Sequence, residues 1–249
     1  MRNLAPTFPP LLTGHKLASD KNLPNWAKAR AADRRLGAGD LVWSEDADNL
    51  HFALVLEPDV SRERCPEILF VAMVAIGDAI GALSPPELSI MYQWPSIILA
   101  NEAELGRLDL SISHTETDAI PDWMVLRVDL RIKPDRRHED PGKNAAQTNL
   151  WEEGAGDLSR TALLESTSRH LVNLIHSWSD GGFKPIHEQW WGRRSQKKPM
   201  PVELMADDSR MLLGMDEYGN ALLKQAQGNG VLSTLDALKT LRSNKDADS

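Results

Sequence analysis

Cysteine is nearly absent from this chain of 249 residues, and aromatic side chains make up only 6% of it. Because Cys65 is the single cysteine, no disulfide can form within the chain, as is typical of proteins in a reducing compartment. Positive charge is also in short supply, since 28 Lys and Arg face 36 Asp and Glu, for a formal net charge of −8. An acidic chain of this kind gives no sign of a nucleic-acid-binding surface.

Long apolar runs are missing as well. The longest one, ILFVAMVAIGDAIGAL, is interrupted by Asp78 and falls short of the roughly 18 apolar residues that a membrane-spanning helix needs. Prolines break up the N-terminal stretch MRNLAPTFPP, which makes it a poor secretory signal. The seven histidines show no strong metal-ligand spacing. We therefore predict a cytoplasmic protein with no membrane or nucleic-acid partner and no tightly bound metal.

Apolar spacing predicts two long helices. Residues 61–83 are apolar on almost every side from Ile68 onward, which indicates a helix that is buried on most faces, with Ser61 as its cap. Residues 159–178 carry leucines at helical spacing, and the glycines that follow, Gly181 and Gly182, end this second helix.

Strand-like runs occur on both sides of the first helix. The run at 121–133 alternates strictly and places Arg127, Asp129 and Arg131 on one face. A long polar loop follows at 134–148. Runs of strands separated by single helices predict an α+β fold, with a mixed or antiparallel sheet and helices on one face.

The C-terminal part predicts a small β unit. RRSQKKP at 193–199 is polar and ends in proline, so it is interpreted as a linker between a domain at 1–192 and a unit at 199–241. VELMA, SRMLLGMD and NALLKQA are predicted as short strands, with a hairpin turn at DEYG. About 45 residues bury too little surface to be very stable alone, so this unit should pack on the larger domain.

The stretch MYQWPSIILANEAELGRL, residues 91–108, places a Trp-Pro pair between two apolar runs. It resembles the central hairpin of the biotin and lipoate protein ligases, in which Lys-Trp-Pro-Asn-Asp ends one strand and Lys-(Leu/Val)-(Ala/Gly/Cys)-Gly opens the return strand. Here QWPSI, residues 93–97, stands at the first motif and ELGR, residues 104–107, at the second. The strand that ends at Trp94 and Pro95 is predicted to have Leu105 to Ser113 as its neighbour.

Further likenesses follow in the family's order. A Gly-rich loop and then a tryptophan occur at 36–43, AAQTNLWEEGAGDLSRTALLESTSRHL resembles the passage into the last helix, and SRMLLGMDEYGNALLKQ resembles the terminal barrel. The resemblance covers most of residues 30–241. It implies a class II synthetase-like ligase domain with packed helices and a small SH3-like β unit at the C-terminus.

The resemblance also implies chemistry. In the family, ATP and a small carboxylic acid such as biotin or lipoate form an acyl-adenylate with the help of Mg²⁺. A lysine of a biotinyl or lipoyl carrier domain then accepts the acyl group. The ligand-binding residues implied by the matched motifs are Arg34, Arg35, Gly37, Gly39, Trp43, Gln93, Trp94, Pro95, Leu105, Gly106 and Arg107.

The chain departs from the family pattern at the positions whose side chains take part in the reaction. Gln93 and Glu104 stand at the two lysine positions, so no catalytic residue is assigned. The loop arginines precede the glycines, and the glycine-rich strand of the family matches only 126–131, which lacks glycine. Adenylate formation needs positive charge near the α-phosphate, and an acid at a lysine position inverts the local field.

Each matched residue also has a structural interpretation. Trp94 either stacks on a ligand or belongs to the core, and Gly106 either admits a ligand or marks a bulge or a tight strand crossing. The arginines, Arg107 among them, either bind phosphate or lie in solvent. Glu104 is either a new acid or metal ligand, or a charge at a hairpin tip.

Two functions are therefore predicted side by side. One is an ATP-dependent biotin or lipoate protein ligase. The other is a catalytically impaired or re-purposed relative that binds a small carboxylic acid or nucleotide without ligase turnover. The residues leave the identity of the acid and the oligomeric state open.

Overall fold

A computed structural model describes residues 5–17, 23–45, 48–134, 146–205, 211–225 and 228–247. Its strands are β1 (Thr13–Leu17), β2 (Asp40–Ser44), β3 (Asn49–Leu56), β4 (Ile90–Gln93), β5 (Ile97–Ala100), β6 (Ala103–Ile112), β7 (Met124–Arg131), β8 (Met211–Met215), β9 (Ala221–Gln225) and β10 (Gly228–Leu232). Its helices are α1 (Leu23–Ala32), α2 (Glu67–Leu83), η2 (Trp151–Ala155), α3 (Arg160–Gly181), α4 (Lys184–Gly192), η3 (Val202–Leu204) and α5 (Thr234–Ala247). Most of the predicted loop at 134–148 lies outside the described residues.

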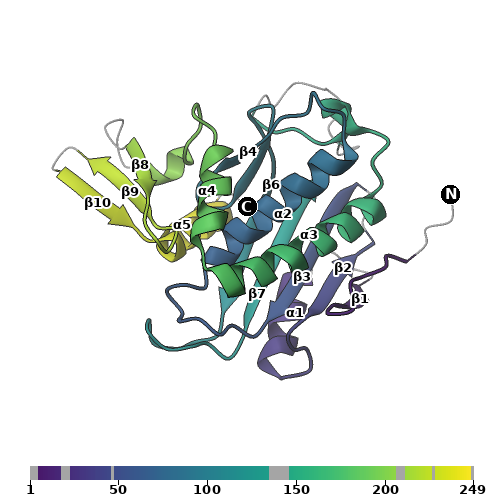
Figure 1. The fold of residues 1–249 in the computed structure, drawn as a ribbon, viewed down its shortest axis with the longest axis horizontal. Helices are drawn as coiled ribbons and strands as arrows, with labels where there is room; N and C mark the ends of the chain where they lie inside the picture. Colours follow the sequence, from purple (N-terminus) through teal and green to yellow (C-terminus); the bar gives the residue numbers. More distant parts are fainter. Residues whose placement is uncertain are drawn as a thin grey trace.

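A seven-stranded sheet forms the centre of the molecule, in the order β1-β2-β3-β7-β6-β5-β4 (Figure 1). β1 and β2 run parallel, and the other neighbouring pairs are antiparallel. The mixed sheet of the predicted α+β fold is confirmed.

Helices α2 and α3 pack together across one face of this sheet, with α4 beside them (Figure 1). The predicted burial of α2 is confirmed, because its residues from 67 to 77 are all buried. The predicted start and cap were wrong, since the helix begins at Glu67 after Pro66, while Ser61 lies in the preceding turn. Proline is accepted at the start of a helix and not further in. For α3 the boundary was close, and Ser159 caps it by accepting a hydrogen bond from the Ala162 amide at 3.1 Å.

The second face of the sheet is also partly covered, which corrects the prediction of helices on one face. Leu23, Ala27 and Ala31 of α1 pack there with Val42 of β2 and Ala53 of β3. Successive side chains of a strand point to opposite faces of the sheet. Because β2 and β3 carry several apolar residues in a row, both faces expose apolar side chains that other elements must bury.

The Trp-Pro turn joins β4 to β5, and this corrects the predicted pairing. β4 pairs with β5, and β5 in turn pairs with β6, so β6 lies one strand further from β4 than predicted. Trp94 and Pro95, joined by a cis peptide bond, do follow the strand as predicted. The run 97–100 is short but fully buried. It forms a strand of its own, β5, because pairing with β4 and β6 satisfies its buried backbone groups.

The C-terminal unit is a three-stranded antiparallel sheet, β8-β9-β10, with α5 after it. The predicted hairpin at DEYG is confirmed, and Asp216 accepts hydrogen bonds from the amides of Tyr218 and Asn220. VELMA was predicted as a strand and instead contains the short helix η3, whereas β10 and α5 were not predicted as elements. The GNGVL segment of β10 has weak strand propensity, and only its pairing with β9 makes it a strand.

The unit packs on the rest of the chain, as predicted. Trp94 Nε1 donates a hydrogen bond to the Gly219 carbonyl at 2.9 Å, and Phe70 lies directly against Gly219. The segment predicted as a linker runs along β4, where the Tyr92 amide donates to Arg193 O and the Ser195 amide to Tyr92 O. The SH3-like description and the division at 192 and 199 stay predictions. In the described part of the chain, no helix has the length and apolarity to cross a membrane.

Candidate functional site

Charged side chains gather on the second face of the sheet, where β6 and β7 pair. Arg107 lies opposite Asp129, and Asp109 lies opposite Arg127. Together with Ser96, Ile97 and part of α5, these four side chains line a cavity of about 100 Å³. With Arg242 of α5, three arginines line the cavity, and a guanidinium is suited to bind a carboxylate or phosphate.

Arg107 is held by Glu104, three residues before it. Its Nε and Nη2 donate to the two carboxylate oxygens at 2.7 and 2.8 Å, and this hydrogen bonding raises the pKa of Arg107. Arg131 also contacts Glu104, with Nη2 3.6 Å from Oε1. Burial lowers the pKa of Arg131, although a guanidinium stays charged in proteins. Glu104, which stands at a lysine position of the family motif, therefore neutralises Arg107, which the resemblance implied as a ligand-binding residue.

Arg127 is more lightly held. Its Nη2 lies 3.1 Å from Asp129 Oδ2, and His51 Nδ1 lies 2.8 Å from the other oxygen of the same carboxylate. A guanidinium carries five N–H donors, so the contact with Asp129 uses only part of its capacity. Of the arginines that β6 and β7 bring to the cavity, Arg127 is thus better placed to bind an anion.

The C-terminal helix closes one side of the cavity. Leu238, Leu241 and Arg242 of α5 line it. Arg242 donates to Asp109 Oδ1 from Nε at 2.8 Å and from Nη2 at 2.5 Å, and to the Leu110 carbonyl at 2.5 Å. These contacts fix the helix over β6.

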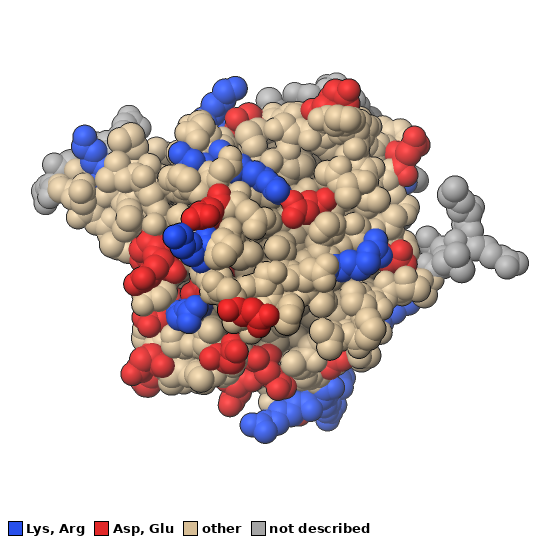
Figure 2. All heavy atoms as spheres, in the orientation of Figure 1, with Lys and Arg blue, Asp and Glu red and all other residues tan. Residues whose placement is uncertain are grey.

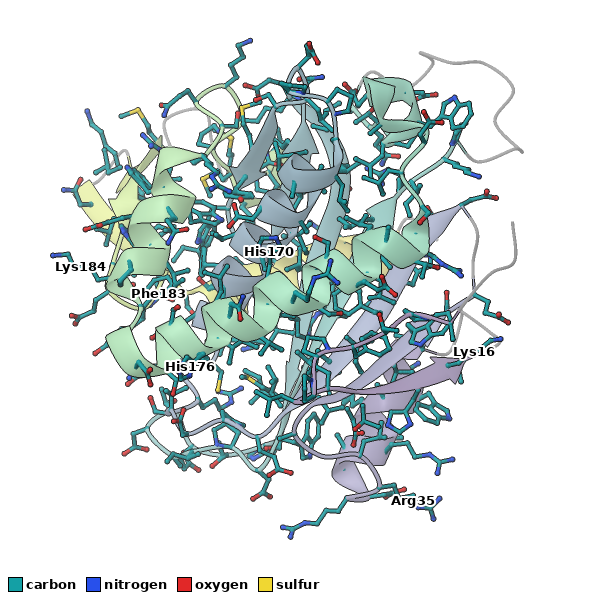
Figure 3. The ribbon with its side chains drawn as sticks, turned by 45° about the vertical axis from the view of Figure 1, so that its right-hand side comes forward. Lys16, Arg35, His170, His176, Phe183 and Lys184 are labelled. Atoms are coloured by element: carbon teal, nitrogen blue, oxygen red, sulfur yellow. The ribbon has the colours of Figure 1, made fainter. Side chains whose placement is uncertain are left out.

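The loop that was expected to bind nucleotide lies apart from this cavity. Arg34 and Arg35 are exposed at the end of α1, and Arg35 points away from the molecule in Figure 3. Gly37 donates its amide to Asp40 Oδ2 at 2.7 Å, and Gly39 touches the backbone of Leu11. The loop is therefore folded against the N-terminal segment, and its predicted ligand contacts stay a prediction.

Most of the other predicted site residues point into the core. Trp43 is buried with the guanidinium of Arg160 5.5 Å from its ring centre, and Trp94 and Leu105 are 0% exposed. Gln93 and Pro95 are also buried. Within the described residues, only Arg107 of the predicted set lines the cavity over β6 and β7.

Gly106 lies where two strands approach closely. A Cβ at this position would collide with the carbonyl oxygen of Asp129 and with the backbone of Leu130. The register between β5 and β6 shifts at Ile98 and Leu99, next to this glycine. The structural interpretation of Gly106, a bulge with a tight strand crossing, is confirmed.

Sequence reasoning missed Arg127, Asp109 and Arg242 as candidate site residues. The alternation of β7 already placed Arg127 with Asp129 on one face, and that was the available signal. Arg242 had no such signal, because it is 133 residues from the carboxylate that it binds.

Other reactive groups of the described residues lie outside this cavity. Cys65 is fully buried, and burial raises the pKa of its thiol to about 12, so it is a poor nucleophile. His170 and His176 both lie on α3 (Figure 3). Among the described residues no three Asp, Glu, His or Cys side chains could hold a metal ion. The carboxylates at the cavity are bonded to arginine or histidine, an arrangement that does not fit a Mg²⁺ site.

The face that carries the helices shows no continuous basic area. In Figure 2 the described Lys and Arg are interspersed with Asp and Glu, and acidic side chains gather at the lower left. This distribution agrees with the net charge of −8.

Comparison with known proteins shows which family the chain belongs to. The sequence model of the Biotin/lipoate A/B protein ligase family matches residues 8–192. The chain is 23% identical over 219 residues to a biotin–[acetyl-CoA-carboxylase] ligase of Paracoccus denitrificans, covering 87% of this chain and 91% of that protein.

Two solved structures show the fold. A biotin protein ligase-like protein of unknown function from Silicibacter sp. TM1040 is 31% identical, with a TM-score of 0.80, covering 94% of this chain and 99% of that one. The biotin protein ligase of Aquifex aeolicus in complex with biotin and ATP is 14% identical, with a TM-score of 0.62 and coverage of 89% and 94%.

Proposed function

The chain belongs to the biotin/lipoate A/B protein ligase family, and from this premise we propose that it binds a small carboxylic acid in the cavity over β6 and β7. The observation that carries the proposal is Arg127, whose guanidinium borders the cavity and is held by Asp129 through one nitrogen. A planar guanidinium suits a carboxylate, which it can bind through two parallel hydrogen bonds.

The same geometry supports a re-purposed member of the family over an ordinary ligase. An adenylation site must stabilise negative charge on the α-phosphate, and the charges on this face are largely cancelled by paired acids. On β7, Arg127 and Asp129 stand in the segment that resembles the family's glycine-rich strand, so side chains take up space that glycines leave open.

Binding is tested by thermal unfolding with biotin, lipoate, octanoate and shorter acids, each with and without ATP and Mg²⁺. A ligand at about 100 times its Kd stabilises the folded state by about 2.7 kcal/mol. Arg127→Met should abolish the shift, whereas Arg169→Met, which removes an exposed arginine on α3, should preserve it. If no acid shifts the unfolding of the wild-type protein, the proposal is wrong.

Turnover is tested separately by labelling a biotinyl carrier domain and by biotin-dependent pyrophosphate exchange, beside an ordinary ligase. We expect a rate lower by at least about 10²–10³, the usual cost of losing one preorganised donor. A comparable rate would favour the ATP-dependent ligase, which forms an acyl-adenylate and passes the acyl group to a carrier lysine. Arg34→Ala and Arg107→Ala would then show whether these arginines replace the missing lysines. For either function we propose a cytoplasmic location.

A further inference from the structure

Helix α5 is attached to β6 through Arg242, which is bonded to Asp109 and to the Leu110 carbonyl. The cavity of about 100 Å³ borders one side of the helix, and a second cavity of about 130 Å³ borders the other side. Leu238 and Arg242 line both cavities, so the two cavities lie next to each other along the helix. This helix lies beyond residues 8–192, the part that the family model matches.

Several contacts hold α5 in place, and at its start the buried Thr234 donates from its hydroxyl to the Gly219 carbonyl at 2.8 Å. Leu238 is 3% exposed and belongs to the main core, and Arg242 is bonded to Asp109 and to the Leu110 carbonyl. Leu241 also lines the first cavity and is only partly buried. It can therefore be changed without removing Leu238, Arg242 or Thr234, which attach the helix.

The cavity is small for an acid of the size that the family uses. An apolar cavity of about 150 Å³ holds one benzene molecule, and drug-sized ligands occupy about 300–1,000 Å³. At about 100 Å³, the space beside Arg127 accommodates a carboxylate with a short chain, and because the cavity is partly open, the fused rings of biotin would extend out of it.

We propose that α5 sets the upper size limit of the ligand, with Leu241 as the wall that selects a short-chain carboxylic acid. This inference rests on the proposed function, because it assumes that the acid binds at Arg127. The carboxylate is held by the guanidinium, and the chain extends between Ile97 and Leu241, two of the apolar residues of the lining. Each further methylene group of the acid that is buried against apolar side chains raises the affinity about fourfold. This gain stops where the chain meets Leu241.

The experiment measures the Kd of straight-chain carboxylates from acetate to decanoate by titration calorimetry. For the wild-type protein, affinity should rise by about fourfold per carbon and then fall beyond a short optimum. Leu241→Ala removes the wall, so the optimum should move toward longer chains by about three carbons. Leu241→Phe should move it toward shorter chains. Leu174→Ala is the matched control, since Leu174 is also partly buried but lies on α3 against the other face.

The outcomes separate the two claims. The inference is overturned if the optimum is the same in the wild-type, Leu241→Ala and Leu241→Phe proteins while Arg127→Met abolishes binding, and in that case the proposed acid site stands. It is also overturned if Leu174→Ala moves the optimum as far as Leu241→Ala does. If no acid binds to any of these proteins, the proposed function itself fails, and the size limit fails with it. Opposite shifts for Leu241→Ala and Leu241→Phe would support the inference even if one variant is poorly folded.

Discussion

The two faces of the seven-stranded sheet are built from the same strands and differ in composition. On the face covered by α2 and α3, Leu108 and Leu110 of β6 and Leu126 and Val128 of β7 join one large core. On the opposite face, the residues between them are charged: Arg127 is bonded to Asp129 of its own strand, and Asp109 is bonded to Arg242 of α5. The first face preserves the family's fold, and the second face is where this chain departs from the family's motifs. The difference teaches that a fold can persist by packing while the chemistry of its exposed face changes.

The largest effect on stability is expected from a substitution that creates a cavity in the core on the apolar side of the sheet. Phe70 is fully buried, with its ring centre 5.5 Å from that of Phe183 and 5.2 Å from that of Trp190. Phe70→Ala should lower the free energy of unfolding by about 3–5 kcal/mol, because it removes buried area and leaves a cavity. Denaturant unfolding measures the loss, with Phe70→Leu as the milder control. A loss below about 1 kcal/mol would contradict the central role of this core.

A second prediction concerns the close approach of β6 and β7 at Gly106. Gly106→Ala should cost about 1–3 kcal/mol, because the new methyl group meets the backbone of Asp129 and forces β6 and β7 apart. Gly81→Ala is the control, since Gly81 lies in α2 with open space around it, and alanine should stabilise the helix by about 0.5–1 kcal/mol. Equal effects of the two variants on the unfolding midpoint would disprove the tight crossing.

The third prediction sharpens the link between the core and the C-terminal unit. Trp94→Phe keeps most of the aromatic packing and removes the hydrogen bond to Gly219, at a cost of about 0.5–1.5 kcal/mol. Because the bond joins two parts of the chain, hydrogen exchange should rise in β8 and β9 more than in β3. Uniform exchange across the three strands would show that this bond does not tie the unit down.

The smallest effect is expected on the charged face. Arg127→Met removes an ion pair whose side chains are 36% and 31% exposed, so stability should change by no more than about 1 kcal/mol. The same variant should abolish binding of the acid, which separates the site from the fold. A loss near that of Phe70→Ala, measured by the same denaturant unfolding, would mean that the charged face supports the fold as much as the core does.

Local patterns in the sequence determined much of this protein. The all-round apolar character of α2, the alternation of β7 and the turn residues at DEYG are set by near neighbours, so they could be predicted. The order of the Trp-Pro hairpin and its flanking motifs was enough to indicate the family. The helix cap at Ser61 failed because a proline five residues later competes for the helix start.

Only the tertiary structure decided where the candidate site lies. It turned Trp94 into the core, folded the Gly-rich loop against the N-terminal segment, and brought Arg127 to a cavity. It also laid α5 across β6, through a pair of side chains, Asp109 and Arg242, that are 133 residues apart. Contacts of that range depend on how whole elements pack, and no periodicity within a short window encodes them.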